Sequence, residues 1–373
     1  MSDKDLIRSV EDGSAWDNFC DTLKETGKQI MRPEAPADAF TRAEGWRYLT
    51  RLTRIALDMF MECSDRDFPT FYRPSHETAK IGADNPDNFY ERAEINGMYD
   101  YRITGTRGTV AYLGLIAIAG GYEDEDANMR SVGALDTHGG LEVSEDGTIE
   151  IILSREPKPE YKSGNWLKIT EDTIAVLVRQ TFLDRNSETI AELKIERILE
   201  EGVVPEPLDP AQLAENLVKT AGFVKGTATL FADWAESFLD KPNELPPADQ
   251  AYCQKIGGDP NIFYYHSYYD LAEDESLVVE VPRIPDCENW NLQVDNYWME
   301  SLDYRYLKIH VNKHTAHYND DGSVQIVIGE HNPGHPNWLT TAGHRKGTLA
   351  FRWIGADDIV HPTTRVVKTE SLK

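Results

Sequence analysis

The sequence is poor in cysteine and has no long apolar run. Its four cysteines, Cys20, Cys63, Cys253 and Cys287, are scattered through 373 residues without metal-ligand spacing. We therefore expect reduced thiols, as in a cytoplasmic protein. No apolar stretch approaches the roughly 18 residues that a membrane-spanning helix needs. The first residues lack a basic region followed by an apolar one, so we expect neither a signal peptide nor a membrane anchor.

Basic residues are also scarce. The chain has 38 Lys and Arg against 64 Asp and Glu, which gives a formal net charge of -26. A field of this sign repels phosphate backbones and anionic lipids. Nucleic acid and membrane surfaces are therefore not expected as partners.

Phosphate- and nucleotide-binding motifs are missing. The sequence contains no GxGxxG after a strand pattern, no GxxxxGK[ST], no GxSxG and no HExxH. We expect no nicotinamide, flavin or nucleotide cofactor, and the prediction for cofactors is none.

The chain does contain an internal sequence repeat. An Asp-Gly turn and a β-rich run occupy residues 146–153 and again 321–328. An Asn-Trp-Leu sequence follows at 165–167 and at 337–339, and then a strand that carries Arg179 or Arg352. This repetition predicts two related β modules.

Helical patterns precede and separate these modules. Apolar residues recur at three- and four-residue spacing within 14–63 and 209–240, with Asp209-Pro210 as the start of the second helix. Residues 120–126 look like an acidic loop. The predicted fold class is mainly β with helical insertions (α+β), built from two related antiparallel β-sandwich or jelly-roll modules. The predicted division is a helical cap at 1–75, a first module at 76–205, a helical connector at 206–258 and a second module at 259–373.

Several short motifs resemble a known family. They are Asp84-Asn85-Pro86-Asp87 with Tyr101-Arg102-Ile103 in the first half, and residues 300–305, 337–339, 342–344 and 352–353 in the second. Together they resemble the domain of unknown function 1214 family, which is related to the 1254 group. The resemblance implies β-sandwich or jelly-roll modules with helical insertions, in bacterial proteins often linked to the catabolism of hydrophobic compounds such as terpenoids and steroids. It implies no agreed activity.

The chain departs from the family pattern at two places. Thr340 stands where an Asp is frequent after Asn-Trp-Leu. Glu330-His331-Asn332 stands where an Asp-Pro-Gly turn is usual. Both departures lie beside the polar residues that we consider as a site.

A cofactor-free acid–base site is the first candidate. His344 lies in a Gly-flanked loop, and a histidine near neutral pKa can give or take protons at physiological pH. Asp303 would orient it, and Tyr304 and His310 would polarise a substrate oxygen. The alternative is a structural His344, with Asp303 and Arg352 as a buried ion pair.

A polar strand face is the second element of this site. If residues 306–314 form a strand, Tyr306, Lys308, His310, Asn312 and His314 share one face. The predicted substrate-binding residues are Tyr297, Trp298, Tyr306, His314 and Arg305. A weaker alternative is a metal site at His310, His314 and His331, with imidazole ligands that suit zinc or iron.

These observations lead to three functional hypotheses. The first is a lyase, dehydratase or isomerase, with hydrolase as a variant, acting on a small hydrophobic oxygenated metabolite such as a terpenoid or steroid alcohol. The second is a non-catalytic binding protein for a hydrophobic ligand or a carbohydrate. The third is a metal-dependent oxygenase or hydrolase. Self-association through a sheet edge is a further expectation.

Overall fold

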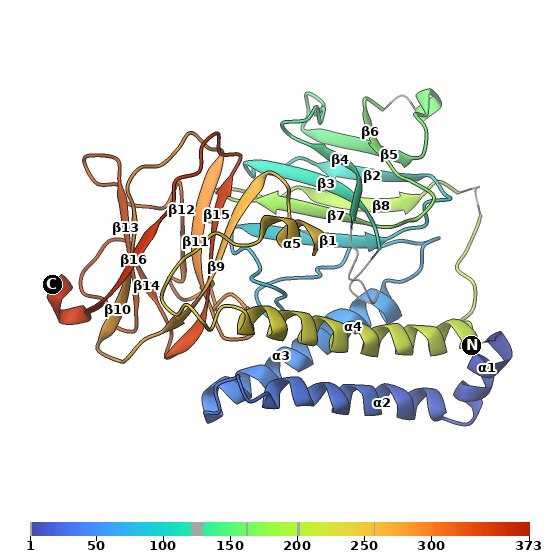
Figure 1. Cartoon of the computed structure of the whole chain (residues 1–373). Helices are drawn as coiled ribbons and strands as arrows, with labels where there is room; N and C mark the ends of the chain where they lie inside the picture. Colours follow the sequence, from blue (N-terminus) through green and yellow to red (C-terminus); the bar gives the residue numbers. More distant parts are fainter. Residues whose placement is uncertain (1, 121–129, 162, 200–201, 257) are drawn as a thin grey trace. The chain divides into compact units, whose positions relative to one another are not determined.

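The computed structural model describes residues 2–120, 130–161, 163–199, 202–256 and 258–373. They form a mixed α+β structure with N-terminal helices, a long central helix and two repeated β-sheet modules whose sheets are not closed (Figure 1). The predicted fold class is confirmed. Most of the expected acidic loop lies outside the described residues.

Helices occupy both predicted helical stretches, the first with one interruption, and the short helices α1 (Asp3–Glu11) and α5 (Gln250–Lys255) lie outside them. Pro33 and Pro36 divide the first stretch, because proline lacks the N–H that a helix interior needs. Asp209 caps the long helix by accepting from the backbone N–H of Ala211 at 2.9 Å, and Pro210 is its first residue, as predicted. The helices are α1 (Asp3–Glu11), α2 (Ser14–Thr26), η1 (Gly27–Met31), α3 (Ala39–Leu57), η2 (Asp58–Glu62), α4 (Pro210–Glu236) and α5 (Gln250–Lys255).

The first module contains two four-stranded sheets. Their strand orders are β1-β7-β3-β4 and β6-β5-β2-β8. The strands are β1 (Asn88–Glu94), β2 (Tyr101–Thr106), β3 (Tyr112–Ala119), β4 (Arg130–Asp136), β5 (Thr148–Ser154), β6 (Asn165–Lys168), β7 (Thr173–Thr181) and β8 (Glu192–Arg197), with the short helix η3 (Pro159–Tyr161).

The second module repeats this arrangement strand for strand. Its sheets have the orders β9-β15-β11-β12 and β14-β13-β10-β16. The strands are β9 (Ile262–Asp270), β10 (Glu275–Val281), β11 (Asn289–Asp295), β12 (His310–Asn312), β13 (Val324–Gly329), β14 (Trp338–Thr340), β15 (Lys346–Ile354) and β16 (Thr363–Lys368), and the chain ends with η4 (Thr369–Leu372).

The Asn-Trp-Leu sequence has the same role in both modules. It lies on a strand that pairs parallel to its neighbour, β6 with β5 and β14 with β13, whereas the other named pairs are antiparallel. Asn337 Nδ2 donates to the carbonyls of His317 and Gln325 at 2.8 and 2.9 Å. Asn165 Nδ2 donates in the same way to Glu142 and Glu150 at 2.8 and 3.0 Å. The amide side chain therefore ties the parallel strand to the rest of the module.

Each module has its own apolar core between its two sheets. In the second module Trp290, Leu292 and Val294 of β11 and Phe351 of β15 face Ile326 of β13, all with an exposed fraction of 1% or less. The first module builds its core from the same strands in the same order, and this core includes Leu115, Val178 and Ile151. The sequence repeat is thus a repeat of a packed sandwich.

The chain forms two compact units, and each combines helical residues with one module. The first unit comprises Met1–Gly27, Thr50–Ala79 and Asp87–Thr227. The second comprises Lys28–Leu49, Lys80–Pro86 and Ala228–Lys373. The four cysteines are free thiols. Among the described residues, no helix is long and apolar enough to cross a membrane.

Candidate functional site

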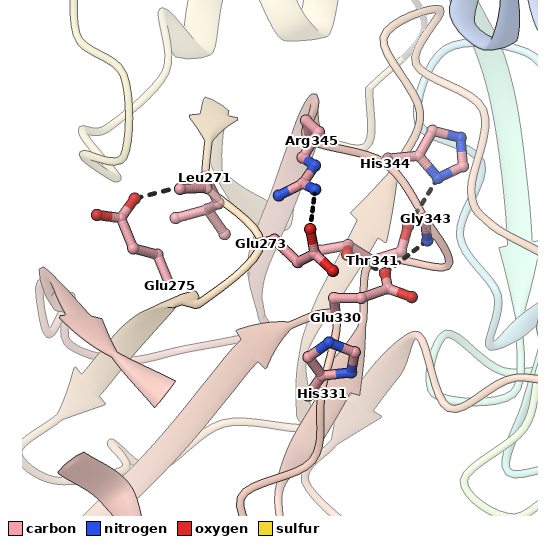
Figure 2. A pocket seen from close by; sticks show the side chains of 10 residues that line it. Leu271, Glu273, Glu275, Glu330, His331, Thr341, Gly343, His344 and Arg345 are labelled. Atoms are coloured by element: carbon pink, nitrogen blue, oxygen red, sulfur yellow. Dashed lines mark hydrogen bonds and ion pairs between the residues drawn. The ribbon is translucent and has the colours of Figure 1, made fainter. Parts of the chain in front are cut away.

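Three loops of the second unit enclose a cavity of about 200 Å³ (Figure 2). They are the turn between β9 and β10, the residues that follow β13, and the loop between β14 and β15. Strands β9 and β15 belong to one sheet, and β10, β13 and β14 to the other. The cavity therefore lies where the ends of the two facing sheets meet. Its lining residues are Leu271, Ala272, Glu273, Glu275, Glu330, His331, Thr341, Gly343, His344 and Arg345.

The loop between β14 and β15 makes a sharp turn that fixes Glu330. Ala342 and Gly343 are consecutive residues with left-handed backbone, at φ of 49° and 86°. Thr340 Oγ1 accepts from the backbone N–H of Ala342 at 2.9 Å and supports this turn. The N–H of Gly343 and the Oγ1 of Thr341 then donate to the same carboxylate oxygen of Glu330, Oε2, at 2.6 and 3.0 Å. Both departures from the family pattern, at Thr340 and Glu330, thus contribute to one structure.

Among the described residues, Glu330 is the carboxylate of the cavity that has no basic partner. Glu273 accepts from Arg345 at 2.8 Å, and Glu275 lies 3.4 Å from Lys368. Within the described residues, Glu330 forms no ion pair, and its Oε1 atom accepts no hydrogen bond. One oxygen of Glu330 is held in place while the other remains available to a ligand.

His344 lines the cavity, but both nitrogens of its imidazole are hydrogen-bonded to other groups of the protein. Nδ1 lies 2.6 Å from the carbonyl oxygen of Thr341, and Nε2 lies 2.5 Å from Oε2 of Glu44. The ring packs against Phe40, with the ring centroids 4.7 Å apart. In Figure 2 the imidazole points away from the carboxylates of Glu273 and Glu330. A carbonyl only accepts, so Nδ1 carries a proton, and the Nε2–Glu44 contact holds one more proton on either partner.

The predicted partnership of Asp303 with His344 is wrong, because Glu44 occupies that place. Asp303 instead accepts two hydrogen bonds from the Arg305 side chain, at 2.9 and 2.7 Å, and this guanidinium lowers the pKa of the carboxyl. Arg352 is bonded elsewhere, so the alternative ion pair with Asp303 is also wrong. Tyr306 beside them is 79% exposed. Asp303, Arg305 and Tyr306 are surface residues here.

The predicted polar strand at 306–314 is much shorter than expected. Only His310–Asn312 forms a strand, β12. Asn312 ends it, because its side chain accepts from the backbone N–H groups of His314 and Thr315 at 3.0 and 2.9 Å and closes a turn. The ring of Tyr304 lies 6.5 Å from that of His310, but His314 is exposed. The five residues 306, 308, 310, 312 and 314 do not share one strand face.

Two other predicted binding residues are buried in the second unit. Trp298 is 2% exposed and donates from Nε1 to the carbonyl of Thr41 at 2.9 Å. Tyr297 is 1% exposed and packs edge to face on Trp298, with 5.0 Å between centroids. These rings fill the interior rather than line the cavity of Figure 2.

The weak metal alternative finds no support in the geometry. In the part of the chain that the structure describes, no three His, Cys, Asp or Glu side chains are grouped so that they could hold a metal ion. His310, His314 and His331 are therefore not brought together as ligands.

A second polar cluster, which the sequence analysis missed, lies on the face of β11 that turns away from the core. Asn291, Gln293 and Asp295 alternate along this strand, and all three have an exposed fraction of 0%. Arg352 of the neighbouring strand β15 donates to Asn291 and Gln293 at 3.2 and 2.5 Å. A fully polar and fully buried sheet face is costly unless its groups are hydrogen-bonded.

The segment Lys80–Pro86 supplies the partners of this buried face. Asn291 Nδ2 donates to Asn85 at 2.8 Å, and Gln293 Nε2 donates to the carbonyl of Asp84 at 2.8 Å. Asp84 accepts from both the backbone N–H and the Oγ of Ser301 at 2.9 Å. The family motifs around residues 84, 301 and 352 therefore meet here. The polar residues at every second position of 291–295 were the sequence signal that would have located the cluster.

Comparison with known proteins shows the family of this chain. The family model described as "Protein of unknown function (DUF1214)" matches residues 90–181 and 268–358, one match in each module. The chain belongs to this family. The crystal structure of an uncharacterised protein from Burkholderia cenocepacia is 55% identical, covers 98% of this chain and 99% of its own, and superposes with a TM-score of 0.93.

A more distant structure shares the fold of this DUF1214 protein. The VPA0106 protein from Vibrio parahaemolyticus is 12% identical, covers 87% of this chain and 98% of its own, and has a TM-score of 0.50. No curated protein matches the sequence.

Proposed function

We propose that this protein is a cofactor-independent acid–base enzyme, a lyase or isomerase, for a small oxygenated metabolite bound in the cavity of Figure 2. The observation that carries the proposal is the state of Glu330. Its carboxylate is fixed through Oε2, carries no ion pair among the described residues, and lines a cavity. A general base needs this combination of fixed position and a free oxygen.

In this proposal Glu330 replaces His344 as the group that exchanges a proton with the substrate. Glu330 Oε1 would accept a proton from a hydroxyl group or an activated C–H of the substrate. The Gly343 N–H and Thr341 Oγ1 would hold the carboxylate in one orientation during the transfer. His344 and Glu44 would position the loop that supplies both donors.

The charge and size of the cavity favour a small, neutral or cationic substrate. Three of its lining residues are Glu and one is Arg, and the chain carries a net charge of -26. An anion would be repelled. The volume of about 200 Å³ is below the about 300–1,000 Å³ that is usual for drug-sized ligands. Small terpenoid alcohols and their esters, which the family resemblance implies, fit this charge and size and are the first class to test.

The experiment incubates the full-length, chelator-treated protein with such a panel and analyses the products by mass spectrometry and chiral chromatography, so that isomers of equal mass are also detected. We expect turnover by the wild type, loss of at least 100-fold in Glu330→Gln, and near wild-type turnover in Glu273→Gln, a neighbouring carboxylate that is paired with Arg345. Turnover that survives Glu330→Gln would refute the assignment of the base.

The second candidate is a binding protein that uses the same cavity without chemistry. The hydrogen bonds of both His344 ring nitrogens favour it, because they leave this histidine unable to act as the acid that would complement Glu330. It predicts saturable retention of a panel compound, weakened by Glu330→Gln, with no product. Product formation decides between the two candidates.

A further inference from the structure

The carboxyl group of Asp295 has one satisfied oxygen and one buried oxygen without a partner. Gln293 Nε2 donates to Oδ1 at 2.6 Å. The other oxygen, Oδ2, is inaccessible and has no hydrogen bond within the described part of the chain. Buried carboxylate oxygens are almost always hydrogen-bonded to protein or to ordered water. An unpartnered Oδ2 therefore indicates a missing partner.

The charged groups around Asp295 have other partners. Lys80 of the covering segment donates to the carbonyls of Ser301 and Leu302, the latter at 2.8 Å. Asp84 of the same segment is bonded to Ser301, and Arg352 of β15 to Asn291, Gln293 and the carbonyl of Ala83.

Strand β9, on the far side of β15 in the same sheet, also places a titratable side chain near this residue. The hydroxyl of Tyr269 donates to the backbone carbonyl of Asp295 at 3.3 Å, not to its carboxyl. None of Lys80, Asp84, Arg352 and Tyr269 therefore supplies the partner of Oδ2.

The first module shows that the fold itself does not require an acid at this position. Arg352 pairs with Asn291 across β15 and β11, and Arg179 pairs with Gly114 across β7 and β3. Asp295 lies four residues after Asn291 in β11. The equivalent residue, four after Gly114 in β3, is Ile118, which is 3% exposed. A buried aliphatic side chain serves the same strand position without any polar cost.

We propose that Asp295 Oδ2 is an internal binding site for one neutral molecule that both donates and accepts hydrogen bonds, a sequestered water molecule. An ionised Oδ2 requires a donor and a protonated one requires an acceptor, and water supplies either. A cation is disfavoured by Lys80 and Arg352 nearby, and an anion by Asp84 and Asp295 itself. This site is separate from the cavity of the proposed function, since none of its residues lines that cavity.

The protonation of Asp295 supports a ligand that can serve both states. Burial, followed by the charge of Asp84, raises the pKa of this carboxyl to about 7, although the Gln293 hydrogen bond, Arg352 and Lys80 act in the opposite direction. The folded pKa thus lies above the usual value near 4 of an unfolded chain. The contribution of Asp295 to stability is then complete below about pH 4 and decreases as the pH rises to about 7.

The test is a pair of crystal structures of the full-length protein, at pH 5.5 and pH 8.5, together with unfolding curves of two variants. We expect a solvent peak within hydrogen-bonding distance of Oδ2 at both pH values. We expect Asp295→Ile, which installs the residue of the first module, to exclude the molecule and to gain stability relative to the wild type as the pH rises from 4 to 7. Asp303→Asn, at a half-buried acid whose pKa is lowered by Arg305 rather than raised, is the control and should show no such gain relative to the wild type.

Two results would overturn the inference. The first is a site that is empty at both pH values. The second is an Asp295→Ile crystal structure that keeps the same solvent peak, because other groups would then hold the molecule. If Asp295→Ile does not fold, Asp295→Asn replaces it in the pH profile, because the amide has nearly the same shape and cannot titrate, while the two wild-type crystal structures still test occupancy.

Discussion

His344 Nε2 lies 2.5 Å from Glu44 Oε2, and the side chains are only 4% and 9% exposed. The contact joins α3 to the loop between β14 and β15 inside the second unit. Because Thr341 occupies the other ring nitrogen, the pair shares one proton at a place where both side chains are buried. The pair thus sets the position of the cavity wall.

Removal of the imidazole should be costly. In His344→Ala, the carboxylate of Glu44 stays buried with Arg47 as its remaining ion-pair partner. Breaking a buried pair from one side destabilises by roughly 3–5 kcal/mol. The exposed pair Arg345–Glu273 is the control, and Arg345→Ala should cost at most about 1 kcal/mol. Urea unfolding at neutral pH measures both, and equal small losses would contradict a structural role of the pair.

Acid should destabilise the second unit through His266. Burial, and then Arg352, lowers the pKa of this imidazole to about 3, against about 6.5 in an unfolded chain. Below pH 6.5 the unfolded chain therefore binds a proton that the folded chain excludes, and stability falls with the pH from about 6.5 towards 3.

A variant and a control isolate this effect. His266→Phe keeps an aromatic ring against Trp234 and Phe238 and should reduce the drop in melting temperature between pH 7 and pH 4. Some drop should remain, because the pKa of His76 in the first unit is also lowered, to about 4. The exposed His314→Gln should leave the drop unchanged, and a similar change in both variants would rule out His266 as its source.

The left-handed Gly343 should matter for the cavity as well as for stability. At φ of 86° an alanine is strained, and such backbone strain costs roughly 1–3 kcal/mol. Gly343→Ala should also shift the N–H that holds Glu330 and thus lower turnover or ligand retention. Gly322→Ala, at φ of 81° in the turn before β13, is the matched control. It should lose similar stability and keep full activity, as measured by thermal unfolding and the product assay.

The asparagines of the two Asn-Trp-Leu sequences should contribute equally to the stability of the fold. Asn337→Ala and Asn165→Ala each leave two carbonyls and one backbone N–H without the amide that satisfies them. An unsatisfied buried group costs roughly 1–3 kcal/mol. We expect a loss of at least that size in both variants by urea unfolding. A large loss in one and none in the other would show that the repeat does not use the motif in the same way.

The fold was largely predictable because its signals are local. The Asp-Gly turns, the Asn-Trp-Leu sequences and the Asp209-Pro210 helix start each act through neighbouring residues, and the structure contains all of them. The strand expected at 306–314 failed because turns that begin at Asp303 and at Asn312 interrupt both ends of it. A periodic pattern does not reveal which polar residue will close a turn.

The site was less predictable because its partners come from distant parts of the sequence. Glu44 lies 300 residues before His344, and nothing in either local sequence indicates the pair. Asp303 lies within a family motif and was chosen partly for that reason, although Arg305 two residues later binds it. Asp295 was accessible to prediction, since its strand alternates polar and apolar residues, but a buried polar face is the rarer outcome of such a pattern.

The division of the second unit into three sequence segments also determines when it can fold during synthesis. Lys28–Leu49 and Lys80–Pro86 are made early, but the strands that they pack with belong to Ala228–Lys373. The central strand β15 is one of the last to be made, and both β9 and β11 depend on it for pairing. Chains emerge N-terminus first, so the early segments wait with Lys80 and Asp84 exposed to water until nearly the whole polypeptide is available. The first unit ends at Thr227 and can form its sandwich earlier.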